Sequence, residues 1–192
     1  LKRMDEFTHI ARAGAACLIL LFIAVRFLLP RSIDKGLSDT HFGWPTRATI
    51  GLGLLCFLAL MAEGSVLDWS AIYFTAEFKV DAGTAGLGYA FFSGGMAASR
   101  FTGDWLRQKF GAVPMVVASA LLTAMSIALA VSVSSFVTAV VAFTFAGIGI
   151  GNIAPVLFAG GGRLEPDAPG RGIAAVTTLG YAGFLAGPPL IG

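Results

Sequence analysis

The sequence predicts an all-α membrane protein, a polytopic bundle of transmembrane helices, from three observations. Of the 192 residues, 56% are hydrophobic and only 12% are charged, whereas soluble proteins carry about 25% charged residues. The mean hydropathy of +0.82 leaves too little polar surface to cover a soluble globule. Apolar runs of membrane-spanning length also recur along the whole chain.

Six of these runs meet the length that a spanning helix needs, ~20 residues with a range of about 17–25. They are Ala13–Leu29, Thr49–Phe74, Gly83–Phe101, Ala112–Val133, Phe136–Gly160 and Gly172–Gly192. A soluble helical bundle would instead show amphipathic stripes. Residues 30–48, which contain two prolines and two glycines, are expected to form a loop.

The basic residues in the connecting segments predict the orientation of the bundle. The segments after the first, third and fifth runs hold seven, namely Arg31, Lys35, Arg47, Arg107, Lys109, Arg163 and Arg171. The loops on the other side hold Lys79, and the N-terminal tail adds Lys2, Arg3 and Arg12 to that poorer side. The basic residues of the tail count against this orientation, but those of the loops favour it. We therefore expect the seven basic residues to face the cytoplasm.

One short segment, residues 99–111, concentrates charge in an otherwise apolar region. Its four charged residues are Arg100, Asp104, Arg107 and Lys109. We expect a tight cytoplasmic turn here, with Arg100 near a helix end, where its stem stays in lipid and its head reaches water. Asp104 is expected to pair with the neighbouring bases or with a helix terminus.

Two acids, Glu63 and Asp68, lie within the second run, and an ionisable group inside a span is a functional-site hypothesis by default. From Thr49, Glu63 lies ~21 Å along a helix and Asp68 roughly 28 Å, so Glu63 is deep and Asp68 is near the outer interface. They point about 140° apart unless Gly64 bends the helix. Glu63 could relay protons or bind a polar solute, or make a structural hydrogen bond. Asp68 could share that role or be an interfacial carboxylate.

Two aromatic residues, Trp69 and Tyr73, follow the acids at the same end of the run. Aromatic side chains at the membrane interface commonly anchor a helix in the headgroup region. They could alternatively stack on a sugar-like ligand.

The fifth and sixth runs carry glycines spaced for close helix contact, with prolines nearby. These residues are Gly147, Gly151 and Pro155 in the fifth run and Gly183, Gly187 and Pro188 in the sixth. The four-residue glycine spacing permits close packing. Pro155 removes a backbone hydrogen bond near Gly151 and predicts a kink. Because broken helices near the midplane often mark transporter sites, the adjacent Asn152 is a candidate binding residue, with a packing role as the alternative.

The order Gly103-Asp104, then Arg107, Lys109 and Gly111, resembles the loop signature of the major facilitator superfamily between helices two and three, repeated more weakly between helices eight and nine. Two positions depart from that signature: Arg100 stands where the family has glycine, and Trp105 follows Asp104 directly. The stretches Met61–Phe74, Gly147–Arg163 and Val176–Gly192 resemble helices seven, ten and eleven of a bacterial, fucose-permease-like branch.

This resemblance implies a register on the twelve-helix fold of that family. Residues 1–29 would be a tail and helix six, residues 30–48 the central cytoplasmic loop, and residues 49–192 helices seven to eleven. Helices one to five and twelve would then belong to a longer protein, whose N-terminal half is an expected partner.

The resemblance also implies a function: secondary active transport of a small polar solute across the bacterial inner membrane by alternating access, with proton coupling. Helices seven and ten line the central cavity in this family, which favours Glu63 and Asn152. The segment Gly103, Asp104, Arg107, Lys109 and Gly111 would latch the cytoplasmic ends of the two halves. The alternative is a solvated loop that fixes topology.

Other classes of function are weighed against transport. A non-transporting membrane sensor or assembly subunit on the same scaffold is the main alternative. An enzyme is not expected, because the sequence shows no clustered nucleophile and base. Cys17 and Cys56 are far apart, and His9 and His41 lie outside the deep apolar runs, so no metal or cofactor is predicted. The small net charge of +2 argues against a nucleic-acid partner.

Overall fold

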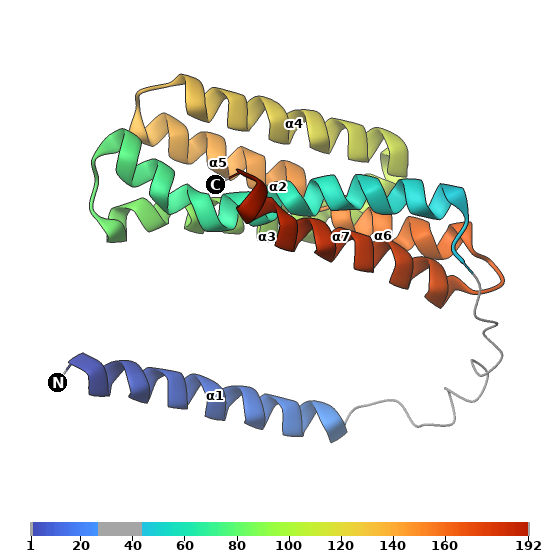
Figure 1. Ribbon diagram of the computed structural model, residues 1–192, viewed down its shortest axis with the longest axis horizontal. Helices are drawn as coiled ribbons and strands as arrows, with labels where there is room; N and C mark the ends of the chain where they lie inside the picture. The colour runs from blue at the N-terminus through green and yellow to red at the C-terminus, as the bar shows by residue number, and fades with distance from the viewer. Residues whose placement is uncertain (1, 27–43, 192) are drawn as a thin grey trace. The chain divides into compact units, whose positions relative to one another are not determined.

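The computed structural model describes residues 2–26 and 44–191, and within these ranges it contains helices and short turns with no strand (Figure 1). The chain divides into two compact units, Leu1–Phe42 and Gly43–Gly192. In the first unit, α1 spans Lys2–Arg26 and includes the apolar stretch Ile10–Ala24. The predicted all-α class is confirmed. Most of the predicted central loop, residues 30–48, lies outside the described residues.

The second unit is a helical bundle. Its helices are α2 (Arg47–Phe78), α3 (Ala82–Phe110), α4 (Ala112–Ser132), α5 (Phe136–Ile150), α6 (Ile153–Leu164) and α7 (Pro169–Ile191). Four helical segments of the described chain are long and apolar enough to cross a membrane: α2, α4, residues 136–164 and α7. The multi-pass membrane class therefore holds. Of the other two predicted spans, the apolar stretch of α1 is shorter and α3, although 29 residues long, is less apolar.

The connection between α3 and α4 differs from the expected turn. We predicted that the helix ends at Phe101, but α3 continues to Phe110 and Gly111 alone joins it to α4. Gly111 adopts a φ of +85°, and its N–H closes α3 on the Arg107 carbonyl at 2.9 Å. The charged residues extend the helix because Trp, Leu, Arg, Gln and Lys are compatible with helical backbone and no proline interrupts them. The extension adds about 14 Å to α3.

Helix α7 lies along α2, and the contact between them is made through glycines (Figure 1). A β-carbon at Gly187 would lie 2.6 Å from the Met61 carbonyl oxygen, and one at Gly64 would lie 2.7 Å from the Phe184 carbonyl oxygen. Gly183 meets the backbone of Phe57 in the same way. Such backbone approach is how helices associate in lipid, where hydrophobic burial supplies little drive.

Helices α3 and α5 pack by the same device. A β-carbon at Gly147 would lie 2.8 Å from the Phe92 carbonyl carbon, and one at Gly151 would lie 2.8 Å from the Met96 carbonyl oxygen. The pair Gly183 and Gly187 thus lies at the contact between α7 and α2, and the pair Gly147 and Gly151 lies at the contact between α5 and α3.

An aromatic cluster fills the bundle where α2 ends. Phe74 is fully buried and meets Phe143 edge to face, with ring centroids 5.0 Å apart. Tyr73 stacks on Phe143, and its hydroxyl donates to the Ala130 carbonyl at 2.8 Å. The Tyr73 side chain therefore ties α2 to α4.

The glycine contact between α3 and α5 can be tested with a matched pair of alanine substitutions. Both Gly147→Ala and Gly94→Ala gain about 1 kcal/mol of helix propensity, but no atom of another element lies within 4 Å of a β-carbon at Gly94. Overpacking typically costs about 1–3 kcal/mol. We expect Gly147→Ala to lower the melting temperature of the detergent-solubilised protein and Gly94→Ala to leave it equal or higher. Equal melting of both variants would contradict the contact.

Candidate functional site at the break between α5 and α6

The break between α5 and α6 is the centre of the candidate site. Helix α5 ends at Ile150 and α6 begins at Ile153, so the helix is interrupted a few residues before Pro155. Proline has no N–H, so the carbonyl of Gly151, four residues earlier, has no helical donor. Arg100 of α3 supplies one: its Nε donates to the Gly151 oxygen at 3.1 Å.

A second hydrogen bond returns from the break to α3. The Asn152 side chain is 7% exposed, and its Nδ2 donates to the Ser99 carbonyl at 2.7 Å. A β-carbon at Gly103 would lie 2.7 Å from Asn152 Cγ, so this glycine makes room for the amide. The Arg100 side chain on α3 thus donates to the backbone at the break, and the Asn152 side chain at the break donates to the backbone of α3.

A small cavity of about 210 Å³ opens beside this exchange. Its lining comes from α3 and from the start of α6, with Arg100, Gly103, Asp104, Arg107, Asn152, Pro155 and Val156. The structure therefore brings together two groups that the sequence analysis treated separately, the charged segment of α3 and the residues of the predicted kink.

The remaining residues of the charged segment lie on the α3 surface. Arg107 pairs with Asp104 at 3.4 Å, and the Asp104 side chain is 88% exposed. An exposed ion pair of this kind contributes about 0–1 kcal/mol, so the pair is weak enough to break and form again. The Lys109 ammonium lies 4.9 Å from the centre of the Trp105 ring.

Glu63 is half-buried on α2, and it interacts electrostatically with Arg100 of α3 and with Cys56 on its own helix. Asp68 is exposed. Because α2 is uninterrupted from residue 47 to 78, Gly64 does not break it, and the two acids remain on different faces. The Trp69 Nε1 is buried without a hydrogen-bond partner among the residues that the structure describes.

A buried carboxylate that the sequence did not single out, Glu165, lies in the turn between α6 and α7. The side chain is 3% exposed and accepts hydrogen bonds from the Thr46 N–H at 2.7 Å and the Thr49 hydroxyl at 2.9 Å. Arg171 pairs with its other oxygen at 2.7 Å. These donors, the Thr46 N–H first, lower the pKa of Glu165 to about 2. In the sequence, Glu165 stands six residues before Arg171. This spacing does not identify the partners of Glu165 at the start of α2.

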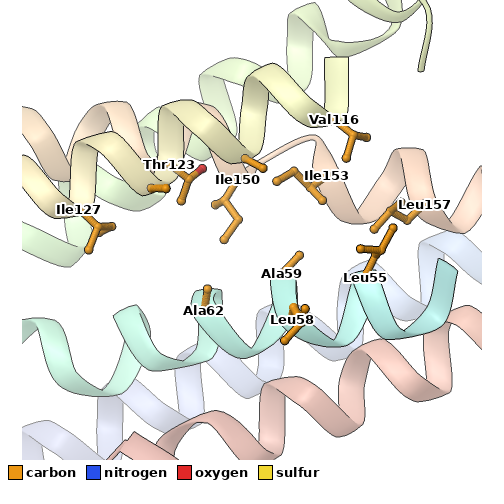
Figure 2. Close-up of a pocket in the computed structure, with 12 residues that line it drawn as sticks. Leu55, Leu58, Ala59, Ala62, Val116, Thr123, Ile127, Ile150, Ile153 and Leu157 are labelled. Atoms are coloured by element: carbon orange, nitrogen blue, oxygen red, sulfur yellow. The ribbon is translucent and has the colours of Figure 1, made fainter. Parts of the chain in front are cut away.

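A larger hollow in this unit has a different chemical character. It measures about 460 Å³ and lies between α2 and α4, with α5 and α6 behind (Figure 2). Of its twelve lining residues, Thr123 alone has a polar side chain, and that hydroxyl donates to the Ser119 carbonyl of its own helix. This groove therefore suits apolar groups rather than a polar solute. Within the described ranges no three His, Cys, Asp or Glu side chains gather as metal ligands would.

Comparisons with known proteins point to one class. An uncharacterized MFS-type transporter of Yersinia pestis is 34% identical over 193 residues, covering 98% of this chain and 49% of that protein. Membrane protein MosC of Rhizobium meliloti is 28% identical, covering 96% of this chain and 46% of its own length. An uncharacterized transporter of Sinorhizobium fredii is 28% identical over 77% of this chain. No family model and no solved structure matches the chain.

The fold, which includes a broken helix with polar groups at the break, defines a polytopic all-α membrane protein. The expected resemblance to the major facilitator superfamily is confirmed, since over nearly all of its length the chain is similar to one half of an MFS-type transporter. The chain spans about half the length of the curated relatives it matches. The fucose-permease-like branch stays a prediction.

The Glu165 network makes stability depend on pH. The pKa of Glu165 in the folded protein, about 2, is below its ordinary value of 4.5. Its contribution is therefore full above pH ~4.5 and is lost as the pH falls toward 2. We expect Glu165→Gln to lower the melting temperature at pH 7, and the gap to the wild-type protein to narrow below pH ~4.5.

The exposed neighbour Asp167 provides the control for this experiment. Asp167→Asn removes an acid from the same turn and should leave the melting temperature unchanged across the same pH range. A Glu165→Gln variant that melts like Asp167→Asn at pH 7 would show that the network does not hold α2 to the turn.

Proposed function

We propose that this chain is part of a secondary active transporter that moves a small polar solute across the bacterial inner membrane by alternating access, with proton coupling. The observation that carries the proposal is its similarity, over nearly the whole chain, to half of a protein named as an MFS-type transporter. The chain itself supplies a helix interrupted at residues 151–152, just before Pro155, within a membrane bundle. Transporters use such breaks to expose backbone groups at a solute site.

The residues proposed to serve the solute or proton pathway are those that place polarity inside the bundle. Glu63 supplies a carboxylate on α2, and Asn152 supplies an amide at the break. An ionisable side chain within a span is costly unless it serves a pathway or has a partner. Glu63 is proposed as the proton-binding group. Asp68 and Trp69, further along α2, are proposed to meet the solute nearer the outer surface.

The charged end of α3 is proposed to act as a conformational latch with the N-terminal half of the longer protein. The Asp104 carboxylate is almost fully exposed, so it is accessible to a helix terminus of another half. A carboxylate at a helix N-terminus contributes roughly 0.3–1 kcal/mol when exposed and up to about 2 when partly buried. That energy suits a contact that opens in every transport cycle.

Transport and its coupling can be tested with one matched pair of variants. The full-length protein would be reconstituted in proteoliposomes and supplied with radiolabelled sugars, sugar acids and amino acids, with and without an inward proton gradient. We expect gradient-driven accumulation of at least one solute, lost in Glu63→Gln because the carboxamide cannot bind a proton. Glu77→Gln, which changes an exposed acid on the same helix, should behave as wild type.

Two results would count against the proposal. Gradient-driven accumulation that survives Glu63→Gln would remove Glu63 from proton coupling while leaving transport intact. The absence of accumulation or exchange for every solute would favour the alternative, a non-transporting membrane protein on the same scaffold.

A further inference from the structure

A further hollow, of about 400 Å³, lies between α3 and α4 beside the turn at Gly111 that joins them. It is left open because α4 packs mainly against α5 rather than against α3. Ligand pockets in proteins measure about 300–1,000 Å³, so this hollow can hold part of a small molecule. Its walls are mainly apolar and include Leu106 and Phe110 of α3, Pro114, Met115 and Leu122 of α4, and Ile148 of α5.

Three of the polar side chains in these walls already form hydrogen bonds within the protein. The Ser99 hydroxyl donates to the Met96 carbonyl at 2.9 Å, and the Thr102 hydroxyl donates to the Ser99 carbonyl at 3.0 Å. The Asn152 amide donates to the same Ser99 carbonyl. The interior of the hollow therefore offers an occupant mainly apolar contact, which suits a hydrocarbon chain better than a polar molecule.

The length of the hollow decides which apolar occupant fits. Its lining residues on α4 run from Pro114 to Leu122, about 12 Å along the helix, and those on α3 run from Phe110 back to Ser99, about 17 Å. One leaflet is half of the ~30 Å hydrocarbon core, so ~15 Å. A further transmembrane helix would need the whole core. The hollow therefore fits a lipid chain of a single leaflet better than it fits a helix.

The mouth of the hollow lies at the level of the membrane surface. Helix α4 has 21 residues and is therefore about 31 Å long, which only just matches the hydrocarbon core. Its first residue, Ala112, must then lie close to the lipid headgroups. Trp105, which is 59% exposed near the end of α3, is of the residue type that is enriched at this level.

A positive charge stands beside this mouth. The Lys109 ammonium lies 5.3 Å from the centre of the Phe110 ring, and Phe110 lines the hollow. Arg107 is paired with Asp104, whereas Lys109 has no carboxylate partner among the residues that the structure describes. The first turn of α4 contains no acid either. An apolar chamber of one-leaflet length with an unneutralised cation at its entrance matches a molecule with an apolar chain and an anionic head.

We propose that the hollow between α3 and α4 binds one acyl chain of an anionic phospholipid, whose phosphate is held by Lys109. Basic pockets between transmembrane helices bind anionic headgroups in this way. Lys109 and Asp104 point about 140° apart on α3, so the lipid site and the proposed latch use different faces of the helix. The lipid site does not depend on whether the protein transports a solute.

Native mass spectrometry of the full-length protein, titrated with dioleoyl phosphatidylglycerol or dioleoyl phosphatidylcholine, tests the charge and the hollow separately. At the tightest site we expect phosphatidylglycerol to bind about fivefold more tightly than phosphatidylcholine, the effect of one basic residue at a membrane surface. Lys109→Gln should remove that preference. Ala118→Phe, which places a ring in the hollow from its α4 wall, should weaken the binding of both lipids at this site.

Matched variants separate this site from lipid that coats the whole protein. Arg163→Gln removes one exposed positive charge from α6, and Val117→Phe adds a ring at an exposed position that does not line the hollow. Both should bind the two lipids as the wild type does, and Lys109→Arg should keep the preference for phosphatidylglycerol.

Two results would overturn the proposal. One is a preference for phosphatidylglycerol that survives Lys109→Gln. The other is unchanged lipid binding in Ala118→Phe together with a lower melting temperature, which would show that the hollow is filled by another part of the full-length protein. Should Ala118→Phe fail to fold, the comparison of Lys109→Gln with Arg163→Gln decides. Transport can fail for every solute while the lipid preference holds, so this proposal and the proposed function fail independently.

Discussion

Direct backbone contact between helices, made possible by glycine, is the constraint on which this bundle depends. In lipid, apolar side chains gain little by facing each other, so stability comes from close van der Waals contact and from hydrogen bonds between helices. Gly64, Gly183 and Gly187 bring α7 against α2, and Gly147 and Gly151 bring α5 against α3. Each of these contacts holds two helices together, and they set the distances across which the polar side chains can meet.

The same close approach explains the polar groups of the break. Because α3 and α5 nearly touch at Gly151, a side chain on α3 can reach a backbone carbonyl of its neighbour. Pro155 leaves that carbonyl without its helical donor, and Arg100 provides one. A residue that is costly in a membrane helix is thus tolerated where a proline has created an unsatisfied acceptor. Asn152 donates in the opposite direction, from the break to α3. Each side of this contact therefore donates one hydrogen bond and accepts one.

Two kinds of hollow in the unit have different chemistry. The groove between α2 and α4 is almost entirely apolar, and its size alone would make it the first choice for a binding site. The smaller cavity beside the break is lined by charged and amide side chains. Polar solutes require polar partners once water is removed, so the chemistry of the smaller cavity suits a polar solute better than that of the groove does.

The sequence by itself determined the class of the protein: apolar runs of membrane length predict spanning helices because the backbone must satisfy its hydrogen bonds internally in lipid. It also indicated the region in which a helix would be interrupted, since a proline without an N–H acts locally. It could not show that the charged residues within 99–110 continue α3, because charged residues are compatible with a helix as well as with a turn. Partners remote in sequence were likewise decided by the tertiary structure alone. Arg100 meets Gly151, and Glu165 meets Thr46 and Thr49, because helix packing, not chain order, brings these groups together.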